Sequence, residues 1–275
     1  MPDASKQLEH VVGYVINLES ATNRREHMER IAQCFDIPLK IFPAFTPVNL
    51  PEKWAKFFFD DQGKPWADLK PGEIACYVSH LELMSLAVSQ NSPILIGEDD
   101  LKPLVAKINI LQLLQRLPDD WGFVRLSGNM KSPALVRGSP DEPLIVETMR
   151  QPNNMGLYLV SPEGAKRFIE YSSRRFRAID EDLRRTWEHC AVNYCAVGKL
   201  VDINIFDSNI DAAGNRGDLP ERKRQRVLGP SNVAEAIQKI RWNLSRFGLK
   251  VYLRMLLRIL VTKCRSKSKR NWILH

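Results

Sequence analysis

The chain has 275 residues, of which 44% are hydrophobic, so it has enough apolar material for a sizeable core and is neither disordered nor fibrous. Its five cysteines are odd in number and include no CxxC pair, which argues against a disulfide framework and against a cysteine zinc site. The formal net charge of +8 is unevenly spread, because residues from 222 onward contain 15 Lys and Arg but one acidic residue, Glu235.

This charge shift predicts two parts, a mildly acidic body over residues 1–220 and a basic helical region over residues 221–275. The N-terminal segment has acids ahead of a short apolar stretch and no cationic start, so it indicates a first strand and not a signal peptide. No uncharged apolar stretch reaches about 18 residues, so no membrane-spanning helix is expected. Together with the cysteine pattern, these features favour a reducing cytoplasm.

The body is predicted to alternate strands and helices. Apolar stretches bounded by turn residues indicate strands, and the spacing of Met28, Ile31 and Phe35 is typical of a helix. Ser161 before Pro162 predicts a helix start, and Ser20 or Thr22 is expected to cap the first helix. Such alternation predicts an α/β fold with a mostly parallel central sheet and helices on both faces. The expected strands are 11–18, 39–45, 93–97, 122–128, 143–149 and 155–161, and the expected helices are 20–35, 71–90 and 162–172.

Three carboxylates follow the strand in the stretch PILIGEDDL, namely Glu98, Asp99 and Asp100. Ligands of parallel sheets bind beyond the carboxyl ends of the strands, which is where this triplet is expected to lie. Adjacent carboxylates repel one another unless a divalent cation stands among them, and oxygen ligands suit Mn²⁺ or Mg²⁺. The alternative is that the triplet caps a following helix, where acids are favourable at the positive N-terminus.

Four stretches, taken in order, resemble glycosyltransferase family 25, the bacterial lipooligosaccharide galactosyltransferase type. They are VINLESATNRREHM (15–28), GEIACYVSHLEL (72–83), ILIGEDD (94–100), and GLYLVSPEGAKRFIE with AID (156–170 and 178–180). The resemblance implies a GT-A-like nucleotide-sugar-binding fold in the body, with a UDP-sugar as donor and a divalent metal ion as cofactor. It also implies inverting transfer of a hexose, with galactose as the expected sugar, to a saccharide of lipopolysaccharide or lipooligosaccharide.

The resemblance also assigns donor-side roles. Glu98 and Asp100 are spaced like the outer acids of a DxD motif and are expected to hold the metal, while Asp99 is expected to reach the donor ribose or orient its neighbours. Asn17, Arg24 and Arg25 resemble the family's donor-side residues, and an arginine fork suits phosphate or a uracil edge. The alternative for both arginines is a solvated first-turn face.

The second and fourth stretches supply the remaining candidates. Glu73, Ser79 and His80 match the second stretch and are expected on the donor side, whereas a purely structural histidine is the alternative. Cys76, in the same stretch, is expected to pack in the core. Asp180 is the expected catalytic base, because a carboxylate accepts the proton of an attacking hydroxyl. Asp182 is the second catalytic candidate and Glu181 a competitor, and these acids could instead cap the next helix.

The basic region reads as an amphipathic helix. Lys239, Arg246, Lys250, Arg254 and Arg258 recur at helical spacing beside apolar Ile240, Leu244, Phe247, Val251 and Leu256. This pattern is typical of a helix on an anionic membrane surface, where a lipid-linked oligosaccharide acceptor would lie. It predicts a cytoplasmic protein peripherally associated with the inner membrane, and the alternative is a helix packed on the body with its charges in solvent.

One other class of function uses the same two features. An acidic cluster and a basic region also suit a nucleic-acid-binding protein or a metal-dependent nuclease. The positive charge is confined to residues from 222 onward, and no nucleic-acid motif or aromatic platform surrounds the acids. Nucleic acid is therefore not an expected partner, and the glycosyltransferase interpretation is favoured.

Overall fold

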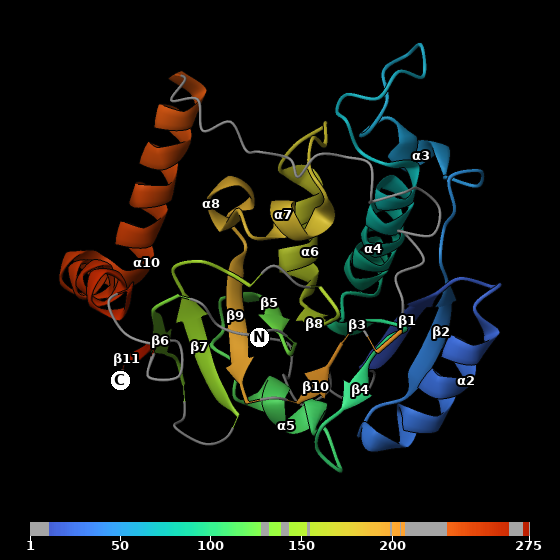
Figure 1. The fold of residues 1–275 in the computed structure, drawn as a ribbon, viewed down its shortest axis with the longest axis horizontal. Coiled ribbons are helices and arrows are strands. Elements are labelled where there is room, and N and C mark those ends of the chain that lie inside the picture. Colours follow the sequence, from blue (N-terminus) through green and yellow to red (C-terminus); the bar gives the residue numbers. More distant parts are fainter. Residues whose placement is uncertain are drawn as a thin grey trace.

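The computed structural model describes residues 11–127, 132–138, 143–152, 155–198, 200–203, 205–206, 230–263 and 272–274. In this part of the chain a large sheet runs through the molecule with helices on both of its faces, which confirms a mixed α/β fold (Figure 1). The predicted boundary between residues 220 and 221 lies outside the described residues.

The larger sheet has nine strands in the order β11-β6-β7-β9-β5-β8-β3-β1-β2, and β10 and β4 form a separate two-stranded sheet. The strands are β1 (Val12–Asn17), β2 (Leu39–Pro43), β3 (Ile94–Glu98), β4 (Lys102–Pro103), β5 (Trp121–Arg125), β6 (Ala134–Val136), β7 (Leu144–Thr148), β8 (Leu157–Val160), β9 (Val192–Val197), β10 (Val201–Asp202) and β11 (Ile273–Leu274). The helices are α2 (Thr22–Ile31), η1 (Ala32–Cys34), α3 (Glu52–Ala55), α4 (Pro71–Gln90), α5 (Ile110–Gln115), α6 (Pro162–Glu170), α7 (Ile179–Leu183), α8 (Thr186–His189) and α10 (Pro230–Lys263).

The direction of the strands refines the expectation of a mostly parallel sheet. Among the described strands, β7 and β8 run opposite to the others, and the sheet is therefore mixed. The parallel pairs β1·β2 and β1·β3 are joined through helices, as a crossover requires. No helix separates β5 from β8 among the residues described between them, so the connection that favours parallel pairing is missing there.

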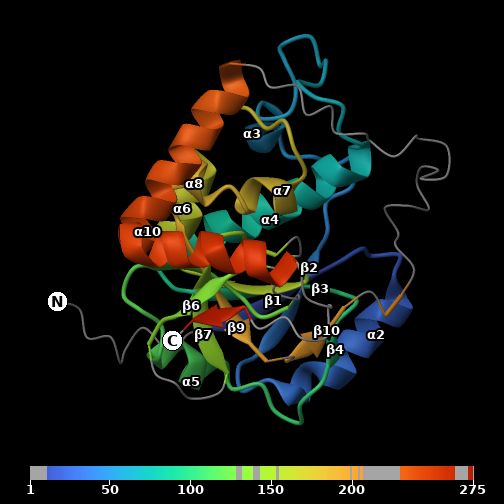
Figure 2. The ribbon, with the colours of Figure 1, turned by 60° about the vertical axis from the view of Figure 1, so that its left-hand side comes forward.

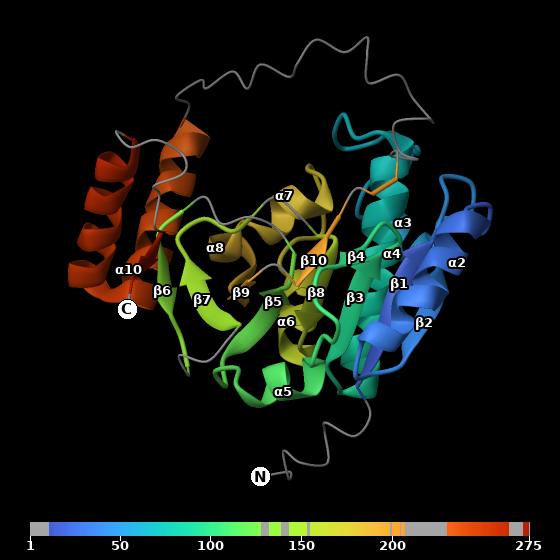
Figure 3. The ribbon, with the colours of Figure 1, turned by 60° about the horizontal axis from the view of Figure 1, so that its bottom comes forward.

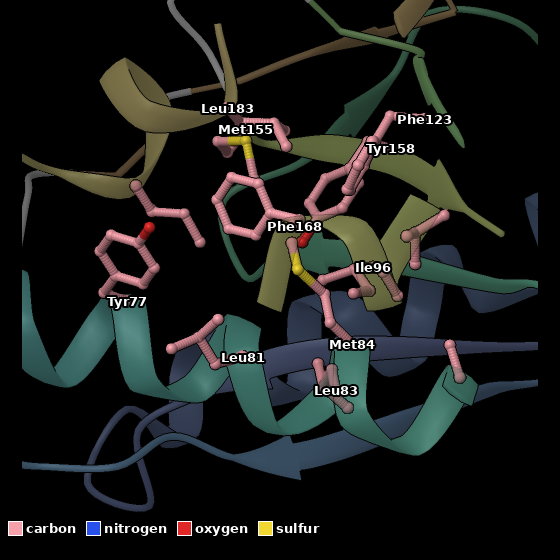
Figure 4. Packing of buried hydrophobic residues seen from close by; sticks show 14 of the residues in the cluster. Tyr77, Leu81, Leu83, Met84, Ile96, Phe123, Met155, Tyr158, Phe168 and Leu183 are labelled. Carbon is pink, nitrogen blue, oxygen red and sulfur yellow. The ribbon is translucent and has the colours of Figure 1, made fainter. Parts of the chain in front are cut away.

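Alternating side chains divide the core between the two faces of the sheet. Ile94 and Ile96 of β3 join the cluster under α4 and α6, whereas Leu95 joins the cluster under α2 and α5. Figure 4 shows how the first cluster closes, with Tyr77 and Phe168 of the helices facing Phe123 and Tyr158 of the sheet. Because both faces of the sheet are buried, β3 and β5 are apolar on both faces up to the polar residues Glu98 and Arg125 that end them.

The predicted N-cap is confirmed for α6 and is wrong for α2. Ser161 caps α6 as predicted, because its Oγ accepts a hydrogen bond from the Gly164 N–H at 3.0 Å. The prediction for the first helix was wrong, because Ala21 is the N-cap of α2 and makes no side-chain cap hydrogen bond. The carbonyl of Ala21 instead accepts a hydrogen bond from Asn17 Nδ2 at 3.2 Å. The start of α2 is thus tied to the end of β1.

Gly164 allows α6 to lie directly on β5, and its substitution is the first testable change. A Cβ at this position would lie 2.4 Å from the carbonyl oxygen and 2.5 Å from the Cα of Gly122. Gly164→Ala should therefore lower the free energy of unfolding by roughly 1–3 kcal/mol, because backbone on both sides must move apart. Urea unfolding measures this loss, and Lys166→Ala on the exposed side of α6 is the control that should change little. Unchanged stability of Gly164→Ala would contradict the close packing.

Helix α10 consists of two arms that meet at Gly248, whose φ of 69° is non-helical (Figure 2). The first arm is fixed to the body by Arg246, which forms ion pairs with Asp120 and Glu147. Phe247 and Met255 are buried in a small cluster with Met149 and Leu274. The sequence placed Phe247 on the membrane-facing stripe, but the structure turns it toward the body. None of the helices in the described ranges is long and apolar enough to cross a membrane.

Candidate functional site

Polar side chains gather where the strands β1, β3 and β5 end. These strands run in the same direction, so Asn17, Glu98 and Arg125 finish them at one edge of the sheet. Asp99 and Asp100 form a turn directly after β3, and the described chain then enters β4 at Lys102 without forming a helix. The interpretation of the acidic triplet as a helix cap is therefore wrong.

Asp99 is held by two of the residues predicted to lie with it. Its Oδ2 accepts a hydrogen bond from Asn17 Nδ2 at 2.8 Å, and its Oδ1 pairs with Arg24 Nη1 at 2.6 Å. Arg25 donates from Nε to Asn17 Oδ1 at 3.3 Å, which extends the network. Arg24 is buried and not on a solvated face, so the alternative for this arginine does not hold. The sheet edge thus positions a cation beside the carboxylates.

Glu98 and Asp100 lie beside Asp99 in an environment that disfavours negative charge. The Glu98 side chain is 37% exposed to solvent, whereas Asp100 is buried. Removal from bulk water, followed by the charges of Asp100, Asp99 and Asp180, raises the pKa of Glu98 to about 8. A divalent cation would relieve this repulsion, and the available oxygens are ligands that Mn²⁺ and Mg²⁺ accept.

His80 lies next to Glu98 and is fully buried. Its Nδ1 is 2.8 Å from the Tyr158 hydroxyl, and its Nε2 is 3.9 Å from Glu98 Oε1. Burial lowers the pKa of His80 to about 3, so the imidazole is neutral at physiological pH. Cys76, one helical turn earlier, joins the same group of side chains. Cys76 was expected only to pack in the core, although its spacing of four residues from His80 indicates a shared helix face.

The two catalytic candidates of α7 occupy different surroundings. The Asp180 carboxylate lies near the cluster, since it adds to the effect of burial in raising the pKa values of Glu98 and of the Cys76 thiol. Asp182 is buried and accepts hydrogen bonds from Tyr77 at 3.0 Å and Arg177 at 2.9 Å. All three acids, Glu181 included, also fall in the first turn of α7. The structure therefore brings Asp180, and not Asp182, toward the acids of β3.

Arg125 is a buried cation at this edge and was not among the residues predicted for the site. It ends β5, and its charge is one of the factors that lower the pKa of Asp180 against the larger effect of burial, which raises it. The signal was present in the sequence, because GFVRLS places an arginine directly after buried apolar residues. A charge that ends a buried strand in an α/β sheet points to a site.

Glu73 and Ser79 make contacts that shape α4. The Glu73 carboxylate accepts a hydrogen bond from the Lys70 N–H at 2.8 Å and so closes the first turn of the helix. Ser79 Oγ accepts from the Phe45 N–H and donates to the Ala75 carbonyl, both at 2.9 Å. Glu73 thus stabilises the start of α4, and Ser79 ties α4 to the segment after β2.

A cavity of about 850 Å³ lies at the opposite edge of the sheet, where Trp121 begins β5. Asp119, Gly122 and Arg246 are among the described residues that line it, and the predicted site residues are not. The cavity is therefore separate from the carboxylates at the end of β3.

Comparisons with known proteins match this arrangement to a family. The model of glycosyltransferase family 25 (LPS biosynthesis protein) matches residues 10–183. A Haemophilus influenzae protein described as a glycosyltransferase is 28% identical over 246 residues, which are 87% of this chain and 86% of its own. The lipooligosaccharide biosynthesis protein lic2B of Haemophilus influenzae is 36% identical over 94 residues, 32% of this chain and 33% of its own.

Solved structures are more distant. A mutant of Drosophila β-1,4-galactosyltransferase 7 in complex with manganese, UDP-Gal and xylobiose is 12% identical, with a TM-score of 0.38 over 78% of this chain and 77% of its own. A TM-score of this size supports no argument about this chain. The family match, by contrast, covers more than half of the chain and includes the acids of β3 and of α7. The chain belongs to glycosyltransferase family 25, the family of LPS biosynthesis glycosyltransferases.

Proposed function

We propose that this glycosyltransferase moves a hexose from a UDP-sugar to a saccharide acceptor of lipooligosaccharide, on a GT-A-like fold, with a divalent metal ion and with inversion. Galactose is the first sugar to test. The observation that supports this most strongly is the carboxylate edge, where Glu98, Asp99 and Asp100 end β3 beside the buried cation Arg24. Acids with a neighbouring arginine suit a metal ion that holds a diphosphate.

Glu98 and Asp100 would hold the metal ion. Both oxygens of Asp99 already accept hydrogen bonds from Asn17 and Arg24, so we assign Asp99 to orienting Arg24. The bound ion would neutralise the charge that develops on the leaving diphosphate. Arg24 would contribute a second positive charge on the same side, as arginine does where phosphate is bound.

Asp180 would act as the base. In an inverting transfer the acceptor hydroxyl oxygen attacks the anomeric carbon, the bond from that carbon to the diphosphate oxygen breaks, and the hydroxyl proton passes to the base. Burial raises the pKa of Asp180 above its ordinary value, so it holds a proton more readily than an exposed aspartate. Asp182 would position α7 through Tyr77 and Arg177.

Binding of UDP is the direct test of this proposal. The melting temperature of the full chain should rise by roughly 5 °C when UDP and Mn²⁺ are each present well above their dissociation constants. An oligonucleotide with Mn²⁺ is the control, since the alternative of a nucleic-acid-binding protein predicts the rise there instead. Stabilisation by the oligonucleotide alone would overturn the proposed donor.

We also propose that the second arm of α10 contacts the anionic surface of the inner membrane, where a lipid-linked acceptor would be reached. Leu249, Leu253, Leu257 and Leu260 are 64%, 49%, 61% and 63% exposed and recur three or four residues apart, so they share one face of the helix. Lys250 and Arg254 are exposed in the same arm. An apolar stripe flanked by bases suits a lipid surface with negative headgroups.

The double substitution Leu253→Glu with Leu257→Glu tests this contact. Sedimentation with phosphatidylglycerol vesicles should weaken by roughly 30-fold or more, because two half-exposed leucines lose their burial in the lipid. Ile237→Glu, which changes an exposed apolar residue of the first arm, should sediment as the unchanged protein does. Turnover of a soluble acceptor should stay the same in all forms. Equal sedimentation of the double variant and the unchanged protein would rule out the second arm as the contact.

A further inference from the structure

Three side chains with different ligand atoms converge at the end of β3. Cys76 and His80 lie four residues apart on α4 and therefore on one face of the helix, and Glu98 reaches them from the end of β3. One sulfur, one nitrogen and one oxygen ligand atom of these residues all lie within 4.8 Å of one another. A small contraction would bring the three atoms to the separations found around a single ion.

His80 shows that this cluster is unsatisfied without a ligand. Its Nε2 is fully buried and has no hydrogen-bond partner among the described residues, although it points toward Glu98 at 3.9 Å. A buried polar atom without a hydrogen-bond partner destabilises the fold unless a ligand binds it. The other ring nitrogen, Nδ1, is bonded to Tyr158, as is usual for an imidazole that binds a metal through its free nitrogen. In the tautomer whose Nδ1–H donates to the Tyr158 hydroxyl, Nε2 carries the lone pair that can coordinate an ion.

We propose that Cys76, His80 and Glu98 form a binding site for a zinc-type transition metal ion. Sulfur and imidazole nitrogen are ligands that Zn²⁺ and Co²⁺ prefer, whereas Mg²⁺ and Mn²⁺ favour oxygen. On binding, the Cys76 thiol releases its proton to solvent and the thiolate coordinates the ion. A water molecule completes the tetrahedron. The partly exposed Glu98 side chain is the point at which the ion enters.

Glu98 belongs both to this site and to the two residues, Glu98 and Asp100, that are proposed to hold Mn²⁺ or Mg²⁺. If the proposed function holds, an ion bound to Cys76 and His80 draws Glu98 away from Asp100, so Zn²⁺ inhibits transfer in competition with Mn²⁺. Binding of Zn²⁺ itself does not depend on the proposed function.

Titration of the metal-free full chain with Co²⁺ tests the site directly. Cobalt bound to Cys76 should give sulfur-to-cobalt charge-transfer absorption in the near ultraviolet, and Zn²⁺ should remove that absorption by displacement. Cys76→Ser should abolish the absorption and weaken Zn²⁺ binding by about 100-fold or more, at least as much as the loss of an outer-shell partner does. Cys190→Ser, which changes an exposed cysteine outside the site, is the matched control and should retain both signals.

Two further variants keep the test decisive. Tyr158→Phe removes the partner of His80 Nδ1 and should weaken Zn²⁺ binding by about 10–100-fold while the absorption remains. Asp100→Ala should keep the absorption even though the proposed donor metal is lost, so failure of the donor proposal and failure of this site give different results. Absorption that survives in Cys76→Ser, or that disappears in Cys190→Ser, would overturn the proposal.

Discussion

Asp100→Ala is expected to abolish the Mn²⁺-dependent binding of UDP, the largest effect predicted for a single residue of this chain. The acid lies in the turn directly after β3 and takes no part in the strand pairing of the sheet, so we expect its loss to affect the site more than the fold. Loss of a proposed metal ligand would leave the diphosphate of UDP without the positive charge that the metal ion would supply. Calorimetric titration of UDP in the presence of Mn²⁺ measures the loss.

Asp119→Asn provides the matched control for Asp100→Ala. Asp119 is an exposed aspartate at the other edge of the sheet, so its replacement should leave UDP binding unchanged. The melting temperature of Asp100→Ala without ligand should stay within a few degrees of the unchanged protein. Normal Mn²⁺-dependent binding of UDP by a folded Asp100→Ala variant would show that the metal assignment is wrong.

Asp180→Asn is expected to lower kcat by roughly 100-fold or more while the affinity for UDP changes little. The amide keeps the shape of the side chain but cannot accept the proton of the acceptor hydroxyl. Because burial raises the pKa of Asp180, the acid limb of the pH profile of kcat should lie above the ordinary range of aspartate. Activity should be lost as the pH falls through that raised pKa, since the base is then protonated. A full pH profile with a soluble acceptor measures both effects.

Asp182→Asn should behave differently from Asp180→Asn. The Asp182 carboxylate holds Tyr77 and Arg177 in a buried position, so its replacement should lower the free energy of unfolding by about 1–3 kcal/mol. Turnover by the fraction that remains folded should stay close to that of the unchanged protein. If Asp182→Asn is stable and inactive while Asp180→Asn is active, the base is Asp182.

Much of the sheet could be predicted because its central strands are buried on both faces. The apolar stretches around Val15, Ile96 and Val124 are continuous, and the structure places a strand at each. Their direction was harder to predict. Strand β8 pairs with β3 and β5, and β7 pairs with β9 as well as with the preceding strand β6. The distant pairings are set by the whole sheet, and no local pattern records which way a strand enters it.

The candidate site, like the sheet, could be predicted only in part. Asn17, Arg24 and Asp99 were expected together, and the structure joins them, because they end or follow neighbouring parallel strands. Arg125 and the group around Cys76 were missed. Their contacts cross from α4 to β3 and from β5 to α7, and such distances are set by the packing of helices on the sheet. Sequence spacing reports one helix face at a time.

The contacts of the first arm of α10 could not be predicted from the sequence either. Its apolar residues fit a membrane-facing stripe and a core-facing stripe equally well, because helical spacing does not say what covers a face. The ion pairs of Arg246 with Glu147 and Asp120 decide the question, and they join residues about 100 positions apart or more. Phe247 is therefore buried, and the exposed leucines lie on the second arm.

Strand β11 covers the β6 end of the large sheet with residues of the basic region. Ile273 and Leu274 pair with Ala134 and Leu135 of β6, a strand that would otherwise offer unpaired backbone groups to other molecules. Figure 1 labels β11 beside β6, and Figure 3 shows β6 at the end of the sheet next to α10. Open strands of this kind recruit further strands and aggregate. Removal of the residues after β10 would uncover β6 and would also remove the proposed membrane contact, and the truncated protein would tend to self-associate. Point substitutions on α10 separate the two effects, whereas a truncation confuses aggregation with membrane binding in any sedimentation assay.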